Sequence, residues 1–328
     1  MKNFGFQWHI TDHCNLRCKH CYQVRFDKSS ELSLEKIKFI VDKISLTLKD
    51  KFITVNITGG EPFLREDLFD ILSYIEDKRN FKEFNIITNA TLIDNEKIDR
   101  LNKFNKFKYL KISLESANEE KNDYVRGKGN FKKVIENIKL FKKNSNKKIL
   151  FMITLGSLNF KEIANFLDFS KDLKVDGVIF ERFVPIGRGL NLKEFYLKSK
   201  EWHEVLKIII YYLDLNLSPY DLLPYKAFWI DLKNSSLKGA LCNLGDESMA
   251  LMPNGNIYPC RRLPIVVGNI LNEDFGEIIF KLKKFKDNII ENLKGKCKNC
   301  EIQDCIGCRA LTYAIKGDLF EEDPQCFL

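Results

Sequence analysis

The 328-residue sequence has no hydrophobic run as long as the roughly 20 residues that a membrane-spanning helix needs. Its longest candidate, residues 206–217, is shorter and contains Lys207 and Asp214. The N-terminus also lacks the basic region, apolar stretch and small-residue cleavage site of a secretion signal. Internal repeats and low-complexity tracts are missing as well. We therefore expect a cytoplasmic protein with no membrane contact, whose ten cysteines stay reduced and serve metal binding or catalysis.

The net charge of +8 raises the question of nucleic-acid binding. The excess comes mainly from lysines spread along the chain, and runs such as residues 281–286 are typical of a solvated helix face. We therefore expect no nucleic-acid partner, whereas a basic groove for an acidic peptide stays open.

The first two thirds of the sequence alternate between strand and helix patterns. Helical spacing appears, for example, at 33–48, 131–143 and 198–213. Repeated strand–helix–strand order indicates a parallel sheet with right-handed crossovers, and six units favour a partial (β/α)6 barrel of the α/β class. Chemistry in such barrels gathers at the C-terminal ends of the strands. The expected strands are 4–11, 52–58, 84–88, 108–114, 148–155 and 175–183.

The alternation ends after the helix at 198–213. We predict a barrel domain at 1–215, a connector at 216–241 and a small cysteine-rich domain at 242–328. Within the last domain, residues 249–260 predict a hairpin turning at Asn254-Gly255, and residues 274–292 predict a helix.

Three cysteines, Cys14, Cys18 and Cys21, follow the first expected strand in a CxxxCxxC pattern. Soft thiolates select iron–sulfur clusters, zinc or copper(I). A structural zinc needs four ligands, and His13 or His20 could supply the fourth. A [4Fe–4S] cluster held by three cysteines instead leaves one iron open for a substrate or cofactor.

This spacing, followed by Tyr22, resembles the signature of radical S-adenosylmethionine (radical SAM) enzymes. The resemblance implies that Cys14, Cys18 and Cys21 hold a catalytic [4Fe–4S] cluster. The cluster's open iron would chelate S-adenosylmethionine and cleave it reductively to a 5′-deoxyadenosyl radical, which abstracts hydrogen from the substrate.

Further loops resemble the same family, from residue 5 to about 190. "TGGEP" is similar to its GGEP motif, which holds the methionine amine, and "TNA" is similar to its TNG, with Ala90 in place of Gly. Ser113 and Glu115 lie where members place ribose contacts, and Arg126 would pair with the methionine carboxylate. Taken singly, Ser113, Glu115 and Arg126 also suit purely structural roles. The implied cofactor-binding residues are Tyr22, Gly59, Gly60, Glu61, Pro62, Asn89, Ser113, Glu115 and Arg126.

The remaining seven cysteines resemble a SPASM domain, an extension of radical SAM enzymes that binds two auxiliary [4Fe–4S] clusters. The central spacing C-x2-C-x4-C-x2-C is one residue shorter than usual in two gaps. Two CxxC pairs also suit a zinc-ribbon-like site. The resemblance implies three clusters in all. One auxiliary cluster would be held by Cys297, Cys300, Cys305 and Cys326, and the other by Cys242, Cys260 and Cys308.

SPASM proteins mostly modify peptides, so the resemblance favours a maturase of a ribosomally made peptide. Peptide epimerases of this superfamily use a free cysteine to return a hydrogen to the substrate radical. Here three ligands and seven ligands account for all ten cysteines, so no cysteine is free for that role. This favours thioether or carbon–carbon crosslinking. Porphyrin side-chain decarboxylation, as in the alternative haem pathway, is an alternative. A sulfatase-maturase-like enzyme is another, although Arg261 stands where those enzymes carry an Asp.

The expected partners are a peptide substrate and a reducing protein such as a flavodoxin or ferredoxin. The chain begins immediately before its first expected strand. We therefore expect the leader of a peptide substrate to be recognised by a separate protein or by the barrel mouth itself.

Overall fold

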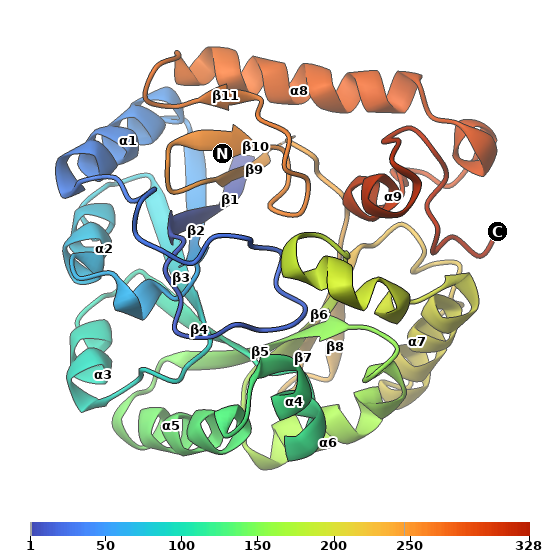
Figure 1. The fold of residues 1–328 in the computed structure, drawn as a ribbon, viewed down its shortest axis with the longest axis horizontal. Coiled ribbons are helices and arrows are strands. Elements are labelled where there is room, and N and C mark those ends of the chain that lie inside the picture. The colour runs from blue at the N-terminus through green and yellow to red at the C-terminus, as the bar shows by residue number, and fades with distance from the viewer. Residues whose placement is uncertain (1, 246) are drawn as a thin grey trace.

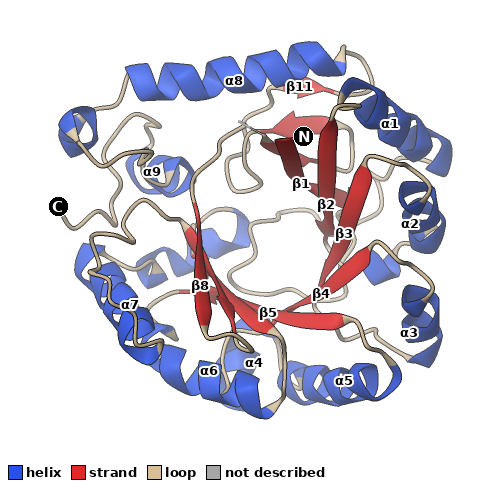
Figure 2. Cartoon of the chain, turned by 180° about the vertical axis from the view of Figure 1, so that it is seen from behind, coloured by secondary structure: helices blue, strands red, loops and turns tan. Residues whose placement is uncertain are grey.

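The computed structural model describes residues 2–245 and 247–328, and its centre is one curved sheet surrounded by helices (Figures 1 and 2). The strand order is β11-β10-β9-β1-β2-β3-β4-β5-β6-β7-β8. Strands β1 to β6 run parallel, each beside the next, as expected for a partial (β/α)6 barrel. The predicted α/β fold is therefore confirmed.

The six parallel strands are β1 (Lys2–Thr11), β2 (Lys51–Gly59), β3 (Phe81–Thr88), β4 (Phe107–Ser113), β5 (Lys148–Leu155) and β6 (Gly177–Arg182). The helices around them are α1 (Leu34–Thr47), α2 (Leu68–Glu76), α3 (Asn95–Asn102), α4 (Glu119–Arg126), α5 (Asn130–Asn144), α6 (Ile163–Asp172) and α7 (Ser199–Tyr212). Short 3-10 segments are η1 (Pro62–Leu64), η2 (Phe160–Glu162) and η3 (Gly187–Phe195).

The C-terminal third adds β7 (Ala227–Asp231), β8 (Ser236–Ala240), β9 (Ser248–Leu251), β10 (Asn256–Tyr258) and β11 (Gly268–Asn269). It also adds α8 (Phe275–Glu291), η4 (Gly295–Asn299) and α9 (Arg309–Lys316).

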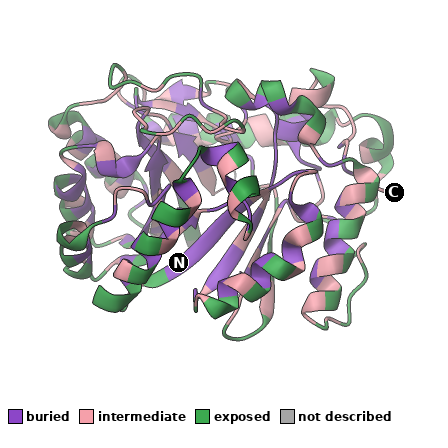
Figure 3. Cartoon of the chain, turned by 60° about the horizontal axis from the view of Figure 1, so that its bottom comes forward, coloured by how far each residue is buried: buried purple, intermediate pink, exposed green. Residues whose placement is uncertain are grey.

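The outer face of the sheet is apolar because alternate residues of each strand point toward the helices. In β1, Phe4, Phe6, Trp8 and Ile10 are all buried. Each helix packs an apolar stripe against this face of the sheet, as α1 does. The first turn of α1 is capped by the Ser33 hydroxyl, which accepts a hydrogen bond from the Lys36 N–H. Figure 3 shows the result, with exposed residues on the outer sides of the helices and buried ones toward the sheet.

Both ends of the sheet differ from a simple barrel. Residues 216–241, expected to be a connector, contain the hairpin β7–β8, which pairs antiparallel with β6. At the other end, β9 pairs parallel with β1 and antiparallel with β10. The predicted Asn254-Gly255 turn joins β9 to β10, and Gly255 takes a φ of 86° that favours glycine. The C-terminal region is thus joined directly to the barrel sheet.

A second, smaller apolar cluster lies in the C-terminal region. It contains Val184, Leu244, Leu263, Ile289, Ile306, Cys308, Ala310 and Leu311. Cys242 and Cys260 pack against this cluster, so apolar side chains surround part of the C-terminal cysteine group. Within the described ranges, no helix is long and apolar enough to cross a membrane.

Candidate functional site

The loop after β1 carries the three N-terminal cysteines across the mouth of the barrel (Figure 1). Cys14, Cys18 and Cys21 line one pocket at the C-terminal ends of the strands. This is the edge at which barrels of this kind place their chemistry.

The glycine pair at the end of β2 holds the start of this loop. A Cβ on Gly59 would lie 2.1 Å from the Thr11 carbonyl oxygen, and one on Gly60 would lie 2.2 Å from that of His13. With glycine at both positions, the two chains approach closely, and the Gly60 N–H donates to the Thr11 carbonyl at 2.8 Å. The two glycines therefore fix the backbone just before Cys14.

The rest of the cysteine loop is held by two other segments. The Lys19 N–H donates to the Val125 carbonyl at the end of α4, at 2.8 Å. From η3, the Gly189 N–H donates to the Cys21 carbonyl at 3.0 Å, and the Arg188 side chain donates to the Cys18 carbonyl at 3.3 Å. Arg188 and Gly189 therefore hold the loop in place.

The sulfur atoms of the loop face hydrogen-bond donors. The Leu16 and Gln23 N–H groups each lie 3.4 Å from a sulfur, those of Cys14 and Cys21 respectively. Arg126 Nη1 lies 3.9 Å from Cys18 Sγ. Burial raises the pKa of the Cys14 thiol to about 12. Free thiols are therefore protonated at neutral pH, and a bound metal would have to displace their protons.

Three thiols in one pocket, with donors directed at sulfur, fit the ligand set of an iron–sulfur cluster. The thiols are not arranged around a single metal ion: among residues 2–245 and 247–328, no three Cys, His, Asp or Glu side chains are grouped in that way.

Glu61 lies at the start of η1, and its carboxylate is completely buried. Its oxygens accept from the Thr88 hydroxyl and the Asn89 N–H, both at 2.8 Å, and from the Phe63 N–H at 3.2 Å. Burial raises the pKa of Glu61 to about 7 despite these bonds. The carboxylate therefore ties the turn after β2 to the end of β3.

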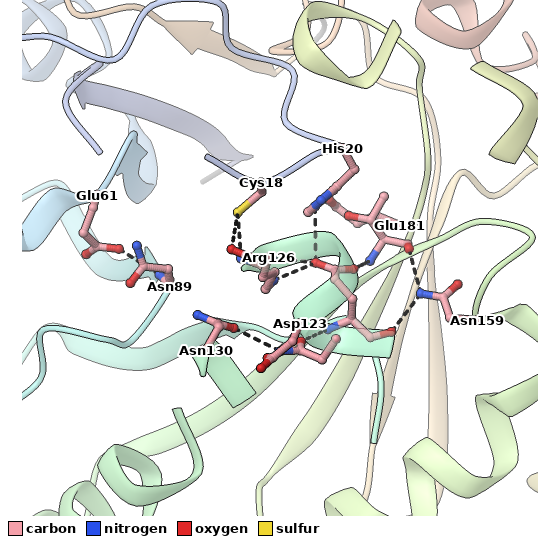
Figure 4. A network of polar contacts seen from close by, with 12 residues as sticks. Cys18, His20, Glu61, Asn89, Asp123, Arg126, Asn130, Asn159 and Glu181 are labelled. Carbon is pink, nitrogen blue, oxygen red and sulfur yellow. Dashed lines mark hydrogen bonds and ion pairs between the residues drawn. The ribbon is translucent and has the colours of Figure 1, made fainter. Parts of the chain in front are cut away.

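Glu115 and Arg126 form a buried ion pair. Figure 4 shows Arg126 beside Cys18 of the cysteine loop. Arg126 Nη2 lies 2.5 Å from Glu115 Oε1, and His20 Nε2 lies 3.3 Å from the same oxygen. Burial alone would raise the pKa of Glu115, but the charges of Arg126 and His20 outweigh it and lower that pKa to about 2. Arg126 is thus already paired with a carboxylate, while its Nη1 stays directed at Cys18.

The structure brings most of the predicted cofactor-binding residues to this pocket. Tyr22, Gly59, Gly60, Asn89, Ser113 and Arg126 line it together with the three cysteines. Glu61, Pro62 and Glu115 are not among its lining residues. Glu61 accepts from the Asn89 N–H and Glu115 pairs with Arg126, so these two carboxylates hold residues that do line the pocket.

Sequence reasoning did not place Glu181, Arg182, Arg261 and Arg262 at this pocket. Arg261 pairs with Glu181 of β6, and its Nη1 donates to the Gln7 side chain of β1 at 2.6 Å. The available signal in the sequence was that Arg261 directly follows Cys260, a predicted cluster ligand.

The C-terminal cysteines form two groups. Cys297, Cys300, Cys305 and Cys326 line one pocket, together with Lys226 and Asp323. Burial, together with the neighbouring thiols of Cys308 and Cys260, raises the pKa of Cys242 to about 12. These thiols therefore lie near one another in a set of four and a set of three, and their role as cluster ligands stays a prediction.

A partial (β/α)6 barrel with three thiols at its catalytic edge, and two further thiol groups beside the barrel, defines an enzyme class built around iron–sulfur chemistry. The sequence model of the radical SAM superfamily matches residues 8–170, and that of the SPASM iron–sulfur cluster-binding domain matches residues 242–301. The chain belongs to the radical SAM enzymes that carry a SPASM domain.

Curated proteins and solved structures resemble the chain over most of its length. It is 28% identical to the AdoMet-dependent heme synthase of Methanosarcina barkeri, over 97% of this chain and 95% of that protein. It is 27% identical to the subtilosin biosynthesis protein AlbA of Bacillus subtilis, over 82% of this chain and 58% of AlbA. The solved structure of anSMEcpe with bound AdoMet has a TM-score of 0.75 and 21% identity, over 99% of this chain and 94% of that one. This last likeness concerns the fold alone.

Proposed function

We propose that the three thiol groups hold three [4Fe–4S] clusters, with S-adenosylmethionine bound at the one between Cys14, Cys18 and Cys21. When bound, S-adenosylmethionine and its cluster would supply a 5′-deoxyadenosyl radical that removes one hydrogen atom from the substrate. An auxiliary cluster would accept one further electron. Reconstituted protein should then contain roughly twelve irons per chain.

The substrate in this proposal is a ribosomally made peptide, which the enzyme crosslinks through a thioether or carbon–carbon bond. The observation that carries the proposal is the grouping of all ten cysteines. Each lies in one of three groups, so no thiol stands apart to return a hydrogen atom to a substrate radical. The reaction therefore ends in oxidation of the substrate, which loses two hydrogens for each crosslink.

The residues of this chain have separate tasks in such a reaction. The glycine pair and η3 hold the cysteine loop at the barrel mouth. Arg126 and Asn89 line the pocket beside the thiols, where a zwitterionic cofactor can pair with charged and polar groups. The Arg261–Glu181 pair forms part of the pocket wall between β6 and the C-terminal region.

Porphyrin side-chain decarboxylation is a second candidate, because a relative named as a haem synthase matches nearly the whole chain. Four arginines line the pocket, and Arg126, Arg182 and Arg261 are each paired with a carboxylate of the chain. Arg262, which has no ion-pair partner among the described residues, suits a substrate that carries carboxylates. A reaction that needs a carboxylate base at the position after Cys260 is disfavoured, because a guanidinium such as that of Arg261 cannot accept a proton near neutral pH.

The test is an anaerobic reaction of reconstituted protein with S-adenosylmethionine and a chemical reductant, followed by mass spectrometry. One arm contains small peptides encoded beside the gene, and the other contains an iron coproporphyrin. We expect a peptide lighter by two hydrogens per crosslink. Loss of carbon dioxide from the porphyrin, with unmodified peptides, would establish the second candidate instead.

The proposal also includes two partners. A flavodoxin or ferredoxin in the cytoplasm would supply the electron that cleaves S-adenosylmethionine. A separate leader-recognition protein, or the barrel mouth itself, would select the peptide.

A further inference from the structure

Lys226 brings a buried positive charge to the four-cysteine group. The residue lies just before β7, outside the ranges matched by the radical SAM and SPASM models. Its side chain lines the pocket formed by Cys297, Cys300, Cys305 and Cys326, and the residue is only 7% exposed. Lys226 Nζ lies 3.8 Å from Cys305 Sγ.

The ammonium group of Lys226 has little else to neutralise it. Its other hydrogen bond is to the Leu223 carbonyl, at 3.3 Å. No carboxylate lies within ion-pair distance of Lys226 among the residues that the structure describes. Asp323 is near enough for Lys226 to help lower its pKa, but that carboxylate is already paired with Arg182, at 3.0 Å. Two cations therefore share one buried anion.

A buried charge is costly unless a counter-charge accompanies it. A cluster held by four thiolates carries negative charge, and its sulfur atoms accept hydrogen bonds. Lys226 is positioned to provide both a donor and a compensating charge at Cys305. The backbone also fixes the residue, because the Lys226 N–H donates to the Ala240 carbonyl at 2.8 Å.

We propose that Lys226 is a positioning residue for electron transfer, which raises the reduction potential of the cluster held by Cys297, Cys300, Cys305 and Cys326. A positive charge near the cluster stabilises its reduced form, which carries one more negative charge than its oxidised form. The charge of Lys226 also reaches Cys242 of the other group, but its direct contact is with Cys305. The effect is therefore larger on the four-cysteine cluster, which favours that cluster as the acceptor of the electron taken from the substrate. The inference depends on the proposed binding of a cluster by these four cysteines.

The test is a redox titration followed by electron paramagnetic resonance on the full chain. Cys14, Cys18 and Cys21 are replaced by Ala in every sample, so that only auxiliary signals remain. Lys226→Met removes the charge at nearly constant size. We expect the equilibrium constant for reduction of one auxiliary cluster to fall about tenfold, which equals about 59 mV for a one-electron couple. Lys226→Arg, which keeps the charge, should stay near the parent value.

Lys294→Met is the matched control, since Lys294 precedes η4 but is half exposed and paired with Asp318. Its potentials should not change. Iron analysis separates the possible failures: a parent protein without iron at the four cysteines contradicts the proposed cluster. Full iron content with the same potentials in Lys226→Met overturns the role of Lys226. If Lys226→Met loses iron, Lys226→Gln is measured instead, because it keeps a hydrogen-bond donor but removes the charge. An unchanged reduction potential in Lys226→Gln also overturns the inference.

Discussion

Arg182 at the end of β6 and Asp323 near the C-terminus form a buried ion pair, with Nη1 and Oδ2 3.0 Å apart. The same carboxylate oxygen accepts from the Cys308 N–H at 2.7 Å, and the Asp323 carbonyl accepts from the Cys326 N–H at 2.9 Å. One residue therefore joins the barrel to members of both C-terminal cysteine groups.

Asp323→Asn should destabilise the protein strongly. The substitution keeps the shape of the side chain but leaves Arg182 buried without its carboxylate, which typically costs about 3–5 kcal/mol. Chemical denaturation at pH 7 measures the loss. Asp318→Asn, which removes the carboxylate of the exposed Lys294–Asp318 pair, is the control and should change stability little. Equal effects of the two substitutions would contradict a special role for the Arg182–Asp323 pair.

Gly60→Ala should selectively remove the proposed cluster between Cys14, Cys18 and Cys21. Its Cβ would collide with the His13 carbonyl oxygen and force the cysteine loop away from β2. We expect iron in the reconstituted protein to fall from roughly twelve to roughly eight per chain, with the auxiliary signals kept. Gly5→Ala in β1 is the matched control, because nothing lies within 4 Å of the added Cβ. Full iron content in Gly60→Ala would show that the loop tolerates the displacement.

Glu61 should make the stability of the cluster-free protein depend on pH. Burial raises its pKa from about 4.5 in the unfolded chain to about 7 in the folded protein. Its contribution is therefore fully present below pH 4.5 and is lost as the pH rises through 7. Relative to Glu61→Gln, the wild type should lose about 3 kcal/mol of unfolding free energy between pH 4.5 and pH 8. Parallel pH profiles of the two proteins would contradict the raised pKa.

Arg126 and Glu115 should affect cofactor binding unequally. If Arg126 pairs with the methionine carboxylate, Arg126→Gln should weaken S-adenosylmethionine binding by about 1.5–3 kcal/mol in anaerobic calorimetry. Glu115→Gln keeps the guanidinium in the pocket and should weaken binding less. Equal losses would mean that the ion pair acts as a structural unit, with no direct contact between Arg126 and the cofactor.

The sequence predicted the fold well where local pattern and burial agree. The parallel strands are apolar runs with regular helices between them, and the Asn254-Gly255 turn carries its own backbone preference. The hairpin β7–β8 was missed because its second strand, Ser236–Ala240, is polar and largely exposed, and backbone pairing with β7 defines it rather than side-chain burial.

The sequence predicted which residues lie at the site better than it predicted which partners their side chains contact. The spacing of Cys14, Cys18 and Cys21 indicated the first group, whereas the division of the C-terminal cysteines came from the SPASM resemblance, because Cys308 lies only three residues after Cys305 but falls in the other group. The directions of Glu61 and Arg126 could not be read in this way, because each is set by a partner on another strand or loop, Thr88 and Glu115 respectively. Lys226 was not foreseen for the same reason: 79 residues separate it from Cys305.

The central claim is that the enzyme oxidises its substrate without returning a hydrogen atom, and the mass of the product formed in heavy water tests this most directly. The anaerobic reaction is run in heavy water with S-adenosylmethionine, reductant and the peptide that the enzyme accepts. We predict a product lighter than the substrate by two hydrogens per modification, with no deuterium at carbon. A product of unchanged composition that has gained one deuterium at carbon would contradict the account, because it requires a thiol hydrogen donor that the ten grouped cysteines do not leave available.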